Sequence, residues 1–141
     1  MLVAVALTIL CLCLPIGTFY AEGMRMAPEY NLWIYTMQGA KDFTTMPLFI
    51  ILLISSALGL YSIFAFHNRI FQARLCVLNM FLIIGWYILF TVFSQILGGS
   101  NIKFELEFAS AAPCFALAMY FLSYKAIWKD EKLVRAADRI R

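Results

Sequence analysis

The sequence has few charged residues, and its central part has almost none. Of the 141 residues, 13% are charged and 64% are hydrophobic. A soluble domain usually holds about 25% charged and about 45–50% apolar residues. One soluble core of this size cannot hide the excess, because small proteins keep a large surface for their volume. The composition therefore predicts that the lipid bilayer surrounds most of the chain.

The chain also has only one histidine, His67, and this scarcity excludes several cofactor chemistries. Haem held by two histidines of one chain is excluded, and so is a histidine-rich metal cluster. Asp130 and Glu131 stand among lysines and arginines, so we expect ion pairs there and no metal site. No catalytic or nucleotide-binding motif stands out either. We therefore expect no cofactor, no metal and no enzymatic activity.

The four cysteines do not resemble a disulfide framework, which would place them in polar loops. All of them lie in or at the ends of apolar segments: Cys11, Cys13, Cys76 and Cys114. Cys11 and Cys13 stand two residues apart, so on a helix they point to different faces. No basic neighbour is present to activate a thiolate. We expect free cysteines that pack as small hydrophobic residues.

Ionisable residues are missing from the interior of the apolar segments. Proton-coupled transport normally needs such a residue within the membrane, and here the first is Lys125, at the edge of the last segment. This absence argues against active transport, though not against a passive pore. The cationic residues stand beside apolar runs, where they determine topology, and form no separate basic face. Nucleic-acid binding is therefore not expected.

Four apolar segments are assigned as spans of a bilayer core of about 30 Å; they are 1–19, 46–66, 75–97 and 108–128. A signal peptide is the alternative for the first segment, but a basic start and a clean cleavage pattern are missing. That segment begins at Met1 without a flanking charge, which indicates a start further upstream. Residues 129–141 form a charged tail of helix-favouring residues, with Glu131 and Arg135 four apart. We predict a single all-α membrane domain of four transmembrane helices with a cytoplasmic C-terminal helix.

Positive residues predict the orientation of these spans. Eight lysines and arginines belong to the hairpin between the second and third segments and to the end of the chain, against three in the two opposite loops. The positive-inside rule then places the hairpin and both termini in the cytoplasm. Thr45 and Pro47 predict the start of the second helix. Within it, Ser55 and Gly59 favour close helix packing inside the chain, with a dimer interface as the alternative.

The loops on the outer side predict a small β element. Ile102, Phe104, Leu106 and Phe108 alternate with charged residues, which is typical of a half-buried strand. A strand needs a partner, and residues 30–37 are the only other segment on this side with β-favouring residues. We therefore predict that 102–108 pairs with 30–37 over the outer membrane face.

Three stretches resemble one known family: Met46–Ile50, Asn68–Asn79 and Asp130–Arg141. Together they are similar to an integral membrane family of Bacteroidetes-type bacteria, domain of unknown function 4293, and the resemblance covers essentially the whole chain. It implies a four-helix protein of the bacterial inner membrane with a cytoplasmic tail, and it carries no activity, substrate or cofactor. Members of this family begin with a short polar segment containing Gln and Arg, which this sequence lacks.

The polar residues of these stretches and their surroundings are expected to form one cytoplasmic interaction surface. Its members are Asn68, Arg69, Gln72, Arg74, Asn79, Asp130, Glu131, Arg135, Asp138 and Arg139. We expect a non-enzymatic scaffold or accessory subunit that presents this surface to a protein partner. One alternative is a homo-oligomer that acts as a passive channel or as a carrier of lipids or small molecules, lined by Ser55, Ser62, Asn79 and Gln95. A second alternative is an enzyme acting on a lipid or quinone at the headgroup level.

Overall fold

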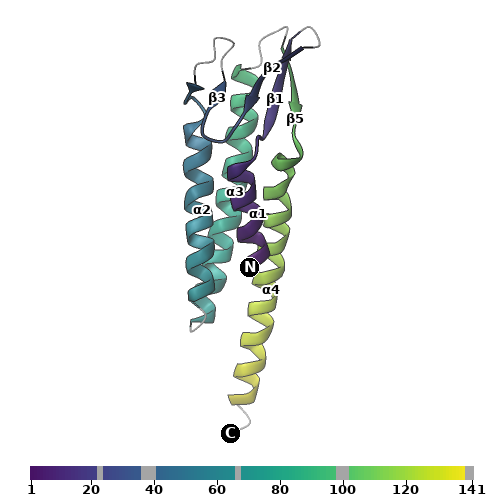
Figure 1. The fold of residues 1–141 in the computed structure, drawn as a ribbon. Helices are drawn as coiled ribbons and strands as arrows, with labels where there is room; N and C mark the ends of the chain where they lie inside the picture. Colours follow the sequence, from purple (N-terminus) through teal and green to yellow (C-terminus); the bar gives the residue numbers. More distant parts are fainter. Residues whose placement is uncertain (22–23, 36–40, 66–67, 98–101, 139–141) are drawn as a thin grey trace.

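The computed structural model describes residues 1–21, 24–35, 41–65, 68–97 and 102–138. These residues are mainly helical, as predicted, with a small sheet at one end of the molecule (Figure 1). The helices are α1 Leu2–Cys13, α2 Met46–Phe64, α3 Arg69–Leu97 and α4 Ala112–Asp138, and a 3-10 turn, η1 Phe108–Ala111, precedes α4.

Two of the described helices, α2 and α3, are long and apolar enough to cross a membrane. The 29 residues of α3 span about 43 Å at 1.5 Å per residue, more than a hydrocarbon core of about 30 Å. The 12 residues of α1 cover only about 18 Å, and the second half of α4 is charged. The structure therefore supports two candidate spans where the sequence predicted four.

The first apolar segment is helical only as far as Cys13, so the prediction of a span over 1–19 was wrong. Pro15 has no N–H, and its ring excludes the helical conformation from the residue before it. Leu14 is accordingly extended, with φ −99° and ψ 156°. The chain then continues as a strand, β1 Gly17–Ala21.

The sheet contains five antiparallel strands in the order β4-β3-β2-β1-β5. The remaining strands are β2 Met24–Glu29, β3 Ile34–Tyr35, β4 Lys41–Asp42 and β5 Ile102–Leu106. The strand predicted near 102–108 is confirmed, but its predicted partner was wrong. Phe104 pairs with Phe19 of β1, whereas Ile34 pairs with Glu29 of β2. The true partner lay within the segment assigned to the first helix.

The helices pack side by side, with α1 and α3 each in contact with both α2 and α4 (Figure 1). Trp86 and Tyr120 are fully buried between them. A Cβ added at Gly59 would collide with the Tyr120 hydroxyl and would lie 2.7 Å from Val5 Cγ2. Gly59 and the buried Ser55 therefore allow α2 to approach its neighbours closely. This confirms that the small residues of α2 pack within the chain.

The sheet is tied to the helices by buried hydrogen bonds at the connecting segments. Asn31 Nδ2 donates to the carbonyl oxygen of Cys11 at 2.6 Å, and Trp86 Nε1 donates to Asn31 Oδ1 at 3.0 Å. The helix α2 begins after Thr45 with Pro47 in its first turn, as predicted. The Thr45 hydroxyl donates to the carbonyl of Tyr30 at 3.2 Å and does not cap the helix.

Candidate interaction surface

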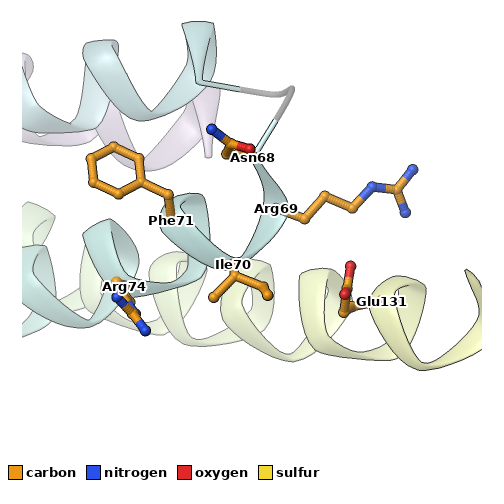
Figure 2. Close-up of a pocket in the computed structure, with 6 residues that line it drawn as sticks. All are labelled: Asn68, Arg69, Ile70, Phe71, Arg74 and Glu131. Carbon is orange, nitrogen blue, oxygen red and sulfur yellow. The ribbon is translucent and has the colours of Figure 1, made fainter. Parts of the chain in front are cut away.

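A pocket of about 450 Å³ lies at the start of α3, at the end of the molecule opposite the sheet (Figure 2). Its lining residues are Asn68, Arg69, Ile70, Phe71, Arg74 and Glu131. Four of them, Asn68, Arg69, Arg74 and Glu131, belong to the predicted interaction surface. The packing of α4 against α3 thus brings Glu131 beside residues that are about sixty positions earlier in the chain.

Positive charges outnumber negative charges among the residues that line this pocket. Arg69 and Arg74 are exposed, and neither guanidinium forms an ion pair in the described part of the chain. Glu131 is half-buried, and its Oε1 accepts a hydrogen bond from Arg135 Nε at 2.9 Å. This is the ion pair that their spacing predicted. Because Arg135 already balances Glu131, the two arginines of α3 carry uncompensated positive charge.

Apolar side chains lie directly beside these charges. In Figure 2, Arg69 and Arg74 leave α3 in different directions, Ile70 extends outward from α3, and Glu131 faces α3 from α4. Ile70 and Phe71 are both exposed. A second, narrow crevice shares Arg69, Ile70 and Glu131 with the pocket, and Ala73, Ile127 and Trp128 complete it. The pocket can therefore hold a molecule that is both anionic and apolar.

The charged end of α4 forms a second exposed feature. It continues without a break from the apolar half of the helix and projects beyond α2 and α3 (Figure 1). Leu133 and Val134 are apolar, yet they are 61% and 45% exposed on this projecting segment. Asp130 is exposed on it as well. The side chain of Asp138 and the whole of Arg139 lie outside the described residues.

Two predicted members do not belong to this surface. Gln72 turns toward α2, where its Nε2 donates to the Ser62 carbonyl at 3.1 Å. Asn79 is fully buried, and its Oδ1 accepts a hydrogen bond from the Ser55 hydroxyl at 2.9 Å. Asn79 lies about 15 Å along α3 from Arg69, where a polar side chain faces a neighbouring helix and not water. Its assignment to the cytoplasmic surface was wrong.

The four residues proposed as a channel lining do not form one continuous lining within the chain. Ser55, Ser62 and Asn79 are buried between the helices, and Ser55 is bonded to Asn79. Gln95 is exposed and lies about 24 Å further along α3 than Asn79.

Sequence reasoning missed Glu29, the last residue of β2. Its side chain is fully buried, and neither carboxylate oxygen has a hydrogen-bond partner among the residues that the structure describes. Burial disfavours the charged form, and it raises the pKa of the Glu29 carboxyl to about 7. The pairing of Glu29 with Gly17 and Ile34 places it in the middle of the sheet. No local signal in the sequence indicated that Glu29 is buried, because its burial depends on the pairing of β2 with β1 and β3, which was not predicted.

Metal ligands do not gather anywhere in the described ranges, where no group of three or more His, Cys, Asp or Glu side chains could hold an ion. All four cysteines are free: Cys11 and Cys76 are buried, and Cys13 and Cys114 are exposed. The polar chemistry that the structure does present is therefore the pocket, the projecting end of α4 and the buried Glu29.

Comparisons with known proteins place the chain in a family. No curated protein and no solved structure matches it. The family model described as Domain of unknown function (DUF4293) matches residues 1–140. The match covers nearly the whole chain and agrees with the resemblance seen in the three sequence stretches. The protein therefore belongs to the DUF4293 family.

Proposed function

We propose that the protein is a multi-pass protein of the bacterial inner membrane that acts as a scaffold or accessory subunit and binds a cytoplasmic protein through the projecting end of α4. The observation that carries this proposal is the exposure of Leu133 and Val134 on a charged helix that extends beyond the rest of the molecule. The proposal includes no enzymatic step.

The membrane placement is supported by the apolar side chains that face outward. Phe81 and Ile96 of α3 are 69% and 70% exposed. Phe115 and Leu122 show that the first half of α4 has the same character. A soluble monomer rarely exposes so large an apolar surface, whereas hydrocarbon accommodates it without cost. We place α1 in the membrane as well, because it packs between α2 and α4.

The orientation follows from the positive charges at one end. Arg69, Arg74 and the charged half of α4 gather at the end opposite the sheet. The positive-inside rule places that end in the cytoplasm. The sheet then lies on the outer face, and both termini are cytoplasmic.

The exposed apolar residues of the projecting helix favour contact with a protein partner over contact with water. Apolar side chains of a helix that are exposed at neighbouring positions can anchor it in the groove of another protein. The surrounding charges, including the exposed Asp130 and the Glu131–Arg135 pair, keep the helix soluble and can form the polar rim of an interface.

The test is co-purification of the tagged full-length chain in mild detergent, analysed by native mass spectrometry. We expect a defined heteromer with the unmodified chain and at least about tenfold less partner after Leu133→Ser with Val134→Ser, because 1.4 kcal/mol of lost contact energy is tenfold in affinity. Lys132→Ser is the matched control, since it changes an exposed residue of the same turn without removing apolar surface. Deletion of residues 130–141 should abolish the complex. Full recovery of the partner with the double variant and with the deletion would overturn the proposal.

A further inference from the structure

We infer that the pocket at the start of α3 binds the phosphate group of an anionic phospholipid from the cytoplasmic leaflet, with Arg69 and Arg74 as its cationic ligands. The inference rests on the proposed membrane placement. It is independent of partner binding by the end of α4.

The first argument is the charge of the pocket. The charged groups around it are Arg69, Arg74 and the pair formed by Glu131 and Arg135. With that pair neutral as a unit, the two arginines that line the pocket carry positive charge without an acceptor among the described residues. An arginine guanidinium presents a planar fork of donors that matches phosphate oxygens. Asn68, at the rim, has an amide that can donate a further hydrogen bond.

The second argument is the shape of the site. The pocket volume of about 450 Å³ falls within the usual range of small-molecule sites, about 300–1,000 Å³. The crevice beside it runs between α3 and α4 past Ala73 and Ile127. Each of these residues lies one turn deeper in the helices than the pocket residues Arg69 and Glu131. The apolar side of the site therefore lies toward the membrane interior, and the crevice itself is too narrow for a water-sized molecule.

A phospholipid matches both parts of the site at once. Its phosphate would lie beside the Arg69 or Arg74 side chain, and the start of an acyl chain would lie against the exposed Ile70 and Phe71. Trp128, which lines the crevice and is partly exposed, has a ring of the kind that favours the headgroup level. Basic pockets between membrane helices on the cytoplasmic side are suited to anionic headgroups. A soluble anion would use the arginines alone and would leave the exposed Ile70 and Phe71 unexplained.

The experiment titrates the delipidated full-length protein in detergent with phosphatidylglycerol or phosphatidylcholine and counts bound lipid by native mass spectrometry. We expect phosphatidylglycerol to bind about tenfold more tightly, because both lipids carry the phosphate but the choline cation of phosphatidylcholine cancels its charge, and a difference of about 1.4 kcal/mol suffices for that ratio. Arg69→Gln with Arg74→Gln should remove the preference. Lys129→Gln with Lys132→Gln removes the same charge from exposed positions outside the pocket and should leave the preference intact.

Three results would overturn the inference. They are an unchanged preference in the arginine variant, an equal loss in the lysine control, and displacement of the lipid by millimolar inorganic phosphate, which would assign the pocket to a soluble anion. Both arginines are exposed, so the variants should fold. The single variants Arg69→Gln and Arg74→Gln, each with half of the charge loss, provide a second measurement of the lipid preference.

Extraction of the membranes at alkaline pH separates the two proposals. A chain released into the soluble fraction would overturn the membrane placement, whereas an integrated chain without lipid preference would overturn the lipid site alone.

Discussion

The indole Nε1 of Trp86 donates a buried hydrogen bond to Asn31 Oδ1 at 3.0 Å, which joins the middle of α3 to the segment between β2 and β3. The amide of Asn31 also donates to the Cys11 carbonyl at the end of α1. One side chain thus connects two helices and the sheet, and all its partners are buried.

We predict that Asn31→Ala lowers the free energy of unfolding by about 2–4 kcal/mol. The change leaves a buried indole N–H and a buried carbonyl without partners, and each such group costs about 1–3 kcal/mol. Denaturant unfolding in detergent, followed by tryptophan fluorescence, measures the effect. Gln95→Ala removes an exposed amide from α3 and should change the stability by less than about 0.5 kcal/mol. Equal effects of the two changes would contradict the role of Asn31.

The buried Glu29 predicts that stability falls as the pH rises. The carboxyl has a pKa of about 7 in the folded chain against 4.5 in the unfolded one, so the folded state binds the proton more tightly. The contribution of the protonated Glu29 to the free energy of unfolding is complete below about pH 4.5 and is lost as the pH rises through about 7. The full loss is about 3 kcal/mol at 1.36 kcal/mol per pKa unit.

Unfolding measurements from pH 4 to pH 8 test this prediction. Glu29→Gln should keep the neutral shape of the side chain and remove most of the pH dependence in this window. Glu105→Gln, at an exposed position of β5, should retain the pH dependence of the unmodified chain. A flat stability profile for the unmodified protein would show that Glu29 is solvated or paired.

The contact between Gly59 and Tyr120 predicts an asymmetry between two glycines. Gly59→Ala places a methyl group against the Tyr120 hydroxyl and Val5, and overpacking of this kind typically costs about 1–3 kcal/mol. Gly85→Ala adds a methyl group with nothing within 4 Å. It should be neutral or should stabilise α3 by up to about 1 kcal/mol, because alanine favours helix. Thermal unfolding in one detergent compares the two variants.

Removal of the Tyr120 hydroxyl tests the same contact from the other side. Within the described part of the chain that hydroxyl has no hydrogen-bond partner, so Tyr120→Phe alone should cost little. In combination with Gly59→Ala it should recover part of the lost stability, which a double-mutant cycle detects. Strict additivity of the two changes would place the cost of Gly59→Ala on Val5 instead.

The hydrogen bond between Ser55 and Asn79 predicts a measurable coupling inside the helices. Polar pairs between membrane helices couple by about 0.6 kcal/mol on average, and by up to about 1.7 kcal/mol. A cycle of Ser55→Ala and Asn79→Ala should give a value in this range, because the pair is fully buried at 2.9 Å. A coupling of zero would indicate that both side chains are hydrated, as in a water-filled channel.

Signals within one helical turn predicted local structure correctly. Thr45 and Pro47 indicated the start of α2, and Glu131 and Arg135 formed the expected pair. These features depend on neighbours in the chain, so the sequence contains all the necessary information. Pro15 is a local signal as well, because its ring excludes the helical conformation from the residue before it. The break at Leu14 shows that the missing N–H was decisive.

The sequence by itself determined the apolar helical character of the chain, its family and the concentration of positive charge at one end. Only the tertiary structure decided that β5 pairs with β1, that Asn79 and Glu29 are buried, and that Glu131 completes a pocket with Arg69 and Arg74. The physical reason is the range of the interactions. Composition and periodicity report what each segment prefers, whereas strand pairing and helix packing depend on contacts between residues that are far apart in the chain.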